Sequence, residues 1–284
     1  MKIYRFENSA GRAALGVLLD DANILDLTGE IQSLTELFEA ADPGSLLDKL
    51  AQKNLPRLPL KSVRLVPPVE QQEVWAVGVT YLRSKKARME ESDFSASAYD
   101  KVYDAARPEL FFKSLPNKVV GTGDAVGIRR DATWNVPEPE LALVVNSRAQ
   151  IVGYTIGNDM SSRDIEGENL LYLPQAKIYS RSCAIGPCIS VGDSEANARQ
   201  WKIQITITRA SLSVFEGETS VAQIKRRFDE LVEYLFRSQE FPHGAILLTG
   251  TGIVPPDGFT LQASDLIRIH ITGVGVLENS VVVV

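Results

Sequence analysis

The stretch WNVPEPELALVVNS, residues 134–147, decides how this chain folds. Two glutamates, Glu138 and Glu140, stand on either side of Pro139 and lead directly into the apolar run LALVV. Side chains two residues apart on a strand point to the same face, about 6.5–7 Å apart along the strand, so these two carboxylates should lie together. Because like charges repel each other, something besides the strand must stabilise the pair.

The segments that follow have the lengths of a β-hairpin: ELALVV, the polar turn NSRAQ, and then IVGYTIGND. Pairing Val145 with Ile151 closes this hairpin and sets Glu138 opposite Asn158. The same register brings Asp159 within about one step of the glutamate pair. The sequence therefore predicts three carboxylates that converge at the open end of one hairpin.

Converging carboxylates beside apolar strands need a compensating positive charge, because a buried unpaired charge is costly. A divalent cation supplies that charge. The predicted ligands are all oxygens, with no His or Cys, which favours Mg²⁺ or Mn²⁺ before Ca²⁺ and disfavours zinc. The alternative is a polar strand end at an exposed sheet edge, where Pro139 and charged side chains discourage pairing with another chain. Both interpretations stay open at this point.

Four other polar residues need an interpretation. Lys177 in LPQAKIYSRS and Glu109 in RPELFFK are either active-site groups or ordinary surface residues, and strand patterns do not decide between the two. His243 follows a proline and His270 lies within IRIHIT. We expect these histidines to be a loop residue and a strand residue rather than catalysts.

Composition limits the class of function. The 30 Lys and Arg against 36 Asp and Glu give a net charge of −6, which argues against nucleic-acid or membrane partners and for a small-molecule substrate. No apolar run approaches the ~18 residues of a spanning helix, and the N-terminus lacks the apolar region of a signal peptide, so we expect a cytoplasmic protein. Cys183 and Cys188 lack the spacing of a disulfide framework or a zinc site, and we expect reduced thiols.

The chain is expected to divide into two parts. Residues 1–66 predict a small N-terminal α/β domain with three strands and a helix capped by Ser33 and Glu36. Prolines between residues 56 and 68 interrupt regular structure and place a domain boundary near residue 66. Residues 67–284 contain apolar strands separated by Gly and Pro, which predicts a β-rich α+β catalytic core.

Two segments of the second part are expected to be helical. Residues 221–237 carry apolar side chains at helical spacing along one face. The charged segment at about 82–106 connects two core strands, and a connection of this length commonly forms a lid over a site. A solvated surface helix is the alternative for this second segment.

Four motifs, PEPELALVV, GYTIGNDMSSRDIE, KIYSRSCAIGP and LLTGTGIV, occur in this order and together resemble the fumarylacetoacetate hydrolase superfamily. The resemblance runs from about residue 70 to the end of the chain. It implies a distorted β-roll core, a metal bound by Glu138, Glu140 and Asp159, and Lys177 in the active site. We also expect a homodimer or homotetramer. The superfamily includes hydrolases, decarboxylases, isomerases and dehydratases, so the fold leaves the reaction open.

One departure from the superfamily pattern narrows the reaction. Hydrolytic and decarboxylating members usually carry NYxxHxxE after the first core strand, whereas this chain reads TYLRSKKA, with Ser84 and Ala87 at the His and Glu positions. The missing pair argues against water activation by that route. The longer patterns YDKVYDAARPELFFKSLPN and ENLLYLPQAKIYS look like the 2-keto-3-deoxy-D-arabinonate dehydratase branch, which implies an acid/base role for Glu109.

The resemblance thus implies a Mg²⁺-dependent hydro-lyase of sugar-acid catabolism that converts a 2-keto-3-deoxy-pentonate into 2,5-dioxopentanoate and water. A metal-bound 2-keto acid has more acidic C3 protons, Lys177 is a plausible base, and Glu109 could assist departure of the C4 hydroxyl. Thr251 and Tyr81 are candidates for substrate contacts. The alternatives are a hydrolase of acylpyruvate-type C–C bonds and a protein that binds metal and keto acid without turnover.

Overall fold

Two sheets dominate the computed structural model, which describes residues 1–20, 22–84, 86 and 100–284. The strands of the larger sheet are β1 (Lys2–Glu7), β2 (Ala13–Leu18), β3 (Asn23–Asp26), β4 (Arg57–Pro59), β5 (Arg64–Leu65), β6 (Glu73–Gly78), β7 (Glu109–Ser114), β10 (Pro139–Val145), β11 (Ile151–Asp159), β13 (Cys183–Val191) and β16 (Ala245–Leu248). Their order is β4-β3-β2-β1-β13-β11-β10-β16-β6-β7, and β5 pairs with β1.

The second sheet covers one face of the first. Its strands are β8 (Ala125–Ile128), β14 (Lys202–Arg209), β15 (Leu212–Ser220), β17 (Leu266–Ile271) and β18 (Gly275–Val283), in the order β15-β14-β17-β18-β8. On β14, Ile203, Ile205 and Ile207 are buried at every second position, as expected for a strand with one wet face. These isoleucines share a core with Leu141 and Leu143 of β10. Because β10 is covered on both faces, all of its residues are buried.

The larger sheet curls back on itself between β13 and β7. After β7 the chain turns, and Val120 forms a parallel bridge with Ala184 of β13. The inward-facing residues of these strands, among them Val74, Val144 and Ile246, belong to one buried cluster. This roll brings the end of β7 close to the ends of β11 and β13, where the site described below is built.

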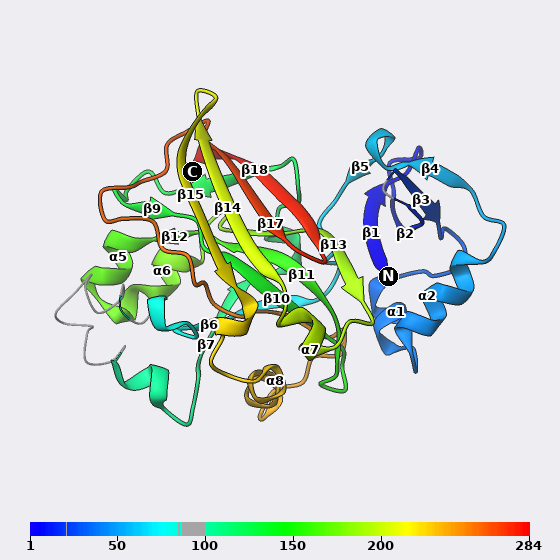
Figure 1. Cartoon of the computed structure of the whole chain (residues 1–284), viewed down its shortest axis with the longest axis horizontal. Coiled ribbons are helices and arrows are strands. Elements are labelled where there is room, and N and C mark those ends of the chain that lie inside the picture. The colour runs from blue at the N-terminus through cyan, green and yellow to red at the C-terminus, as the bar shows by residue number, and fades with distance from the viewer. Residues whose placement is uncertain (21, 85, 87–99) are drawn as a thin grey trace.

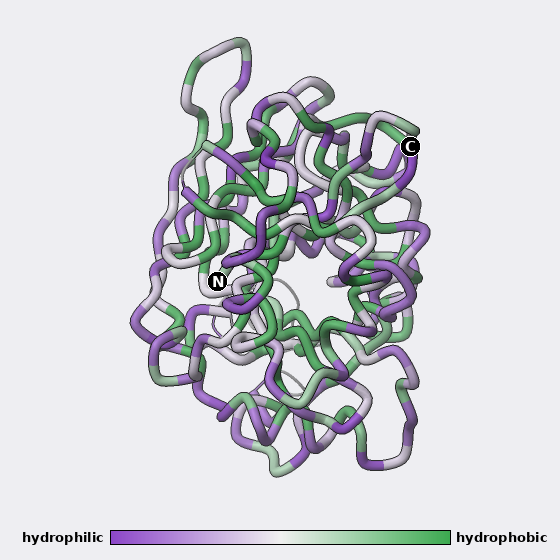
Figure 2. Tube along the Cα trace, turned by 90° about the vertical axis from the view of Figure 1, so that its right-hand side faces the viewer, coloured by the Kyte–Doolittle hydropathy of each residue, from purple (hydrophilic) through white to green (hydrophobic). Residues whose placement is uncertain are grey.

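Short helices lie at the periphery (Figure 1). They are α1 (Leu34–Glu39), α2 (Pro43–Ala51), α5 (Arg163–Glu168), α6 (Leu173–Lys177), α7 (Glu195–Ala198) and α8 (Phe228–Phe236). The first two lie with β1–β4 at one end of the molecule, and α5 and α6 lie at the opposite end. Figure 2 shows hydrophobic residues along the central strands, with many of the hydrophilic residues in the peripheral loops. The prediction of a β-rich α+β fold is confirmed.

The N-terminal region has the strands and the helix that its sequence predicts. Ser33 caps α1, and its Oγ accepts the N–H of Glu36 at 3.1 Å. The Glu36 carboxylate instead accepts the N–H of Gln32 at 2.7 Å, one residue before the expected partner. Ile3 of β1 pairs with Ile189 of β13, so the large sheet runs across the expected boundary near residue 66. The division into domains at that boundary stays a prediction.

The prediction of a single helix over residues 221–237 is wrong. Val221–Gln223 forms a 3-10 turn, and α8 begins only at Phe228. The helix is interrupted because the Lys225 N–H donates to the Thr80 carbonyl at 3.1 Å. The Arg226 guanidinium next to it donates to the Ala105 carbonyl at 2.6 Å. Tertiary contacts therefore outweigh the local helical pattern here.

Several smaller expectations can be compared with the structure. Both cysteines are free and buried, as predicted. His243 lies in a turn and His270 in β17, also as predicted. Of the expected lid at about 82–106, residues 85 and 87–99 lie outside the described residues. Among the described residues, no helix combines the length and apolar character needed to cross a membrane.

Candidate active site

The hairpin formed by β10 and β11 contains a β-bulge that the sequence does not predict. Val145 pairs with Ile151, as predicted, but Val144 pairs with Gly153, so Val152 is left without a partner across the ladder. A bulge inserts one extra residue in one strand and shifts every later pair by one position. The predicted register beyond the turn is therefore off by one residue.

This shift determines how the carboxylates meet. Asn158 lies opposite Pro139 rather than opposite Glu138, and the expected pairing is wrong by that single step. Asp159 then falls beside Glu138, and its N–H donates to the Glu138 carbonyl at 3.0 Å. The bulge thus brings the aspartate and the first glutamate directly across from each other.

Glu138, Glu140 and Asp159 form the predicted cluster. One ligand oxygen from each residue lies within 4.8 Å of the others, and all three side chains are buried. The exposed polar sheet edge considered above is therefore wrong for this segment. Burial and the neighbouring carboxylates of Asp159 and Glu138 raise the pKa of Glu140 well above its ordinary value of 4.5. Three oxygen ligands without His or Cys fit a hard divalent cation, which would offset this repulsion.

The loop after β16 holds Glu140 in place. The Gly250 N–H donates to Glu140 Oε2 at 2.6 Å. Gly250 has a φ of +87°, and a Cβ at this position would lie 2.3 Å from Thr80 Oγ1. Only glycine combines this backbone conformation with so close an approach, so the TGTG motif serves to orient a carboxylate.

Lys177, the last residue of α6, lies against the cluster. Its Nζ donates to Glu138 Oε2 at 2.8 Å and to Ser161 Oγ at 2.6 Å, and it lies 3.4 Å from Asp159 Oδ2. Glu166 Oε2 lies 4.0 Å away. The structure therefore brings Lys177 together with the three carboxylates, although the two motifs are separate in the sequence.

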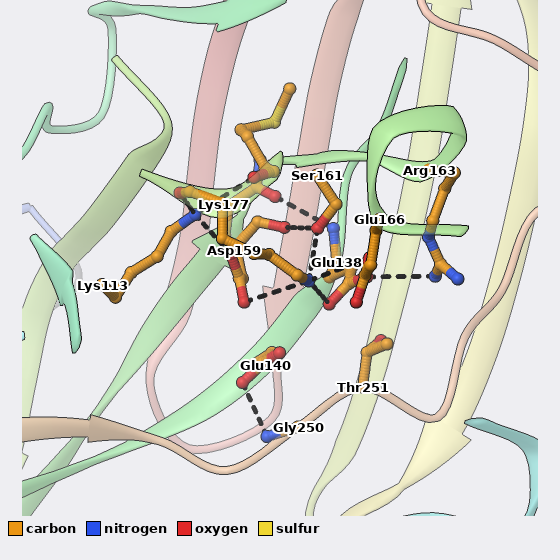
Figure 3. Close-up of polar contacts among 12 residues, drawn as sticks. Lys113, Glu138, Glu140, Asp159, Ser161, Arg163, Glu166, Lys177, Gly250 and Thr251 are labelled. Atoms are coloured by element: carbon orange, nitrogen blue, oxygen red, sulfur yellow. Dashed lines mark hydrogen bonds and ion pairs between the residues drawn. The ribbon is translucent and has the colours of Figure 1, made fainter. Parts of the chain in front are cut away.

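Two further cations, which the sequence analysis did not single out, approach from opposite sides (Figure 3). Lys113 forms an ion pair with Asp159 Oδ1. Arg163 Nη2 lies 3.0 Å from Glu138 Oε1. A signal existed for each, since Lys113 interrupts the apolar strand LFFK and Arg163 belongs to the motif SSRDIE. A charged residue at a buried position implies a partner, but the sequence does not say which one.

Glu109 faces the same small cavity from β7. The cavity has a volume of about 20 Å³ and is lined by Val77, Gly78, Val79, Ser84, Glu109, Phe111, Glu138, Glu140, Asp159, Glu166, Lys177, Gly250 and Thr251. That volume holds roughly one water-sized body. A Cβ at position 78 would lie 2.0 Å from Glu109 Oε2, so the glycine in β6 leaves the space that the carboxylate occupies.

The two residues expected to contact substrate have different surroundings. Thr251 lines the cavity, and its hydroxyl donates to the Pro139 carbonyl at 3.1 Å and accepts the Ile253 N–H at 3.2 Å. Tyr81 is buried in the hydrophobic core and is not among the lining residues. Its hydroxyl has no hydrogen-bond partner within the part of the chain that the structure describes, and burial raises its pKa.

Comparison with known proteins places this geometry in a family. The family described as fumarylacetoacetate (FAA) hydrolase C-terminal matches residues 73–282. The chain belongs to this family. The match covers the roll, the second sheet and every residue of the fumarylacetoacetate hydrolase site described above. The resemblance that the four sequence motifs indicated is confirmed.

Within the fumarylacetoacetate hydrolase family, the chain is similar to two archaeal dehydratases. It is 48% identical over 217 residues to a probable 2-keto-3-deoxyxylonate dehydratase of Haloferax volcanii, covering 76% of this chain and 74% of the relative. It is 41% identical over 233 residues to the 2-dehydro-3-deoxy-D-arabinonate dehydratase of Saccharolobus solfataricus, covering 81% and 78%.

A solved structure of one such enzyme also superimposes on this fold. It is 2-keto-3-deoxy-D-arabinonate dehydratase complexed with magnesium and 2,5-dioxopentanoate, with a TM-score of 0.86 and 34% sequence identity. The alignment covers 100% of this chain and 99% of that one. The similarity therefore includes the N-terminal strands and helices as well as the fumarylacetoacetate hydrolase core.

Proposed function

We propose that this protein is a metal-dependent hydro-lyase that dehydrates a 2-keto-3-deoxy sugar acid, with a 2-keto-3-deoxy-pentonate as substrate and 2,5-dioxopentanoate as product. The observation that carries the proposal is the shared cavity. The three-carboxylate cluster, Lys177 and Glu109 all line it, together with Glu166. The two dehydratases that are 41–48% identical to this chain support the same reaction.

Glu138, Glu140 and Asp159 would hold one Mg²⁺ ion, the metal present in the superimposable dehydratase complex. When bound, Mg²⁺ would polarise the keto group of the substrate and make its C3 protons more acidic. A bound cation would also offset the repulsion among the three carboxylates, which are buried side by side.

Lys177 is the proposed base. Its Nζ lies 2.8 Å from Glu138 Oε2 and 3.4 Å from Asp159 Oδ2, so it would lie beside a keto acid held by a metal at these carboxylates. A metal held by those carboxylates would take up part of the negative charge that now faces the lysine. Lys177 in its neutral form would then accept a C3 proton.

Glu109 is the proposed acid. It lines the cavity from β7, on a different strand from the three metal ligands. In its protonated form it would donate a proton to the C4 hydroxyl, which leaves as water while the C3–C4 double bond forms. One hydrogen from C5 and the C5 hydroxyl proton then pass to C3 and C4, which leaves an aldehyde at C5. The net change is the loss of one water.

A hydrolase of acylpyruvate-type bonds must activate a water molecule. Ser84, which lines the cavity, stands where hydrolytic members of the superfamily have the histidine of their His–Glu pair. Ala87, at the glutamate position, lies outside the described residues. A serine hydroxyl is a poor general base at neutral pH, so this position favours dehydration over hydrolysis.

The test is incubation of the purified protein and Mg²⁺ with an acylpyruvate and, separately, with 2-keto-3-deoxy-pentonates and hexonates, followed by product identification by NMR. We expect 2,5-dioxopentanoate from a pentonate and no cleavage of the acylpyruvate. Rapid acylpyruvate cleavage with every sugar acid left intact would restore the hydrolase alternative. Binding of Mg²⁺ and keto acid without any product would support a binding protein.

Four further expectations accompany this proposal. A small 2-keto acid is the expected partner, in keeping with the substrate proposed above. A homodimer or homotetramer, a cytoplasmic location and a domain boundary near residue 66 stay predictions from the sequence. Sedimentation analysis of the purified protein would measure the oligomeric state.

A further inference from the structure

Lys113 is fully buried, yet it does not line the active-site cavity. It lies near the end of β7 and borders a neighbouring cavity, which Phe112, Ile178 and Tyr179 also line. Burying an ammonium group is costly unless ion pairs and hydrogen bonds compensate for the lost water. This lysine therefore needs partners, and the structure gives it two residues of the site, Asp159 and Lys177, and the neighbouring Met160.

The Lys113 ammonium makes three contacts. It forms an ion pair with Asp159 Oδ1, donates a hydrogen bond to the Met160 carbonyl at 3.0 Å, and donates another to the Lys177 carbonyl. Two of its three protons are thus donated to backbone carbonyls, and its charge is paired with the Asp159 carboxylate. Lys113 does not line the active-site cavity, so it acts through these partners rather than on a substrate.

These contacts connect three segments that are far apart in the sequence. Asp159 ends β11 and Met160 follows it, Lys177 ends α6, and Lys113 itself belongs to β7. The carbonyl of Lys177 is one of the groups at a helix end that lack a partner within the helix. Lys113 satisfies that carbonyl, and the same nitrogen holds the carboxylate of Asp159 (Figure 3).

We propose that Lys113 is a positioning residue that fixes the base Lys177 relative to the metal ligand Asp159; this rests on the function proposed above. The contact to Asp159 uses Oδ1 and leaves Oδ2 on the side of Lys177 Nζ. The contact to the Lys177 carbonyl fixes the backbone from which its side chain extends. A displacement of about 1 Å in such a site can cost roughly 10²-fold in rate.

A simpler role would be charge balance, since Lys113, Lys177 and Arg163 together face the carboxylates. An arginine at position 113 distinguishes charge balance from positioning. It keeps the positive charge, but its planar fork cannot place donors on the same three oxygens as one ammonium nitrogen. Lys113→Arg therefore tests geometry at constant charge, and Lys113→Gln tests a smaller neutral donor.

The experiment measures kcat, KM, the rate of C3 hydrogen exchange in D₂O by NMR, and the Kd for Mg²⁺ by calorimetry without substrate. Lys118→Gln, an exposed lysine five positions along that also borders the neighbouring cavity, is the control. For Lys113→Arg and Lys113→Gln we expect kcat and exchange to fall together by about 10- to 100-fold, the range known for outer-shell partners. KM should change little, saturating Mg²⁺ should not restore the rate, and the control should match the wild type.

Wild-type kcat in either folded Lys113 variant would overturn the proposal. Full recovery at high Mg²⁺ would also overturn it, because Lys113 would then act only through the metal ligand. If Lys113→Arg fails to fold, as circular dichroism would show, Lys113→Gln decides by the same criteria. A wild-type protein that exchanges no C3 hydrogen would instead contradict the proposed function, and the wild-type measurement distinguishes that failure.

Discussion

Two ion pairs of almost equal length lie in opposite surroundings. On the outer face of the five-stranded sheet, Arg268 Nη1 lies 3.1 Å from Glu278 Oε2, and the side chains are 56% and 41% exposed. In the site, Arg163 Nη2 lies 3.0 Å from Glu138 Oε1, and the side chains are 2% and 5% exposed. Water screens the first pair, which is worth about 0–1 kcal/mol, whereas each charge of the second costs several kcal/mol to desolvate.

The comparison shows that the exposure of an ion pair to water, rather than the distance between its charges, sets its energetic effect in this protein. An outer-face carboxylate can lose its partner and turn to water. A carboxylate of the site cannot, so each depends on lysine, arginine, a backbone N–H or a bound cation. The experiments below test this contrast, starting with the largest expected effect.

Removal of the metal should have the largest effect. EDTA should abolish dehydration, and added Mg²⁺ or Mn²⁺ should restore it, because the cation supplies the charge that activates the keto acid. Glu140→Ala should stay inactive at any Mg²⁺ concentration, while Glu278→Ala should respond as the wild type does. Full activity in rigorously metal-free protein would contradict the metal site.

Lys177→Met should have the second-largest effect. Without the base, the protein should lose both dehydration and C3 hydrogen exchange, which NMR in D₂O follows separately. Mg²⁺ binding should persist, since the three carboxylates remain. A variant that still exchanges C3 hydrogen at the wild-type rate would assign the base role to another residue.

Glu109→Gln should affect only the later step. Dehydration should fall by about 10²–10⁴-fold, the usual contribution of a general acid, while C3 exchange and the Kd for Mg²⁺ stay near their wild-type values. Equal losses of exchange and dehydration would show that Glu109 acts before the hydroxyl leaves. Glu278→Gln, which changes the same functional group on the outer face, is the matched control.

Glu140→Gln should raise the free energy of unfolding of the metal-free protein at neutral pH by on the order of 1 kcal/mol. The folded-state pKa of Glu140 lies well above 4.5, so the fold favours its protonated form. The stabilisation from the protonated Glu140 carboxyl group is fully present below its pKa in the unfolded chain. It is lost as the pH rises through its pKa in the folded protein. Thermal melts without metal should therefore show stability falling over that range in the wild type and less so in Glu140→Gln. Identical pH profiles would contradict this assignment.

Glu278→Gln should have the smallest effect. Loss of this exposed pair should change the free energy of unfolding by no more than about 0.5 kcal/mol and leave kcat unchanged. Urea unfolding measures the first quantity. A loss as large as that from a site variant would mean that exposure does not separate the two regions.

Local patterns determined much of this protein. The lengths of ELALVV and IVGYTIGND and the turn NSRAQ between them predict the hairpin, because strand pairing around a short turn depends on neighbouring residues alone. The same pattern places Glu138, Glu140 and Asp159 together at the open end of that hairpin. The β-rich class follows from the spacing of apolar strands between Gly and Pro.

Only the tertiary structure decided the register beyond the bulge at Val152, the break before α8, and the partners of Lys113 and Arg163. Each depends on residues distant in sequence, such as the Thr80 carbonyl that ends the 3-10 turn or the roll that brings β7 to the end of β11. A lysine in LFFK shows that a buried charge needs a partner, but sequence spacing cannot say which carboxylate meets it. That choice belongs to the packing of the whole sheet, because an ion pair in the core forms only where the folded backbone brings both groups together.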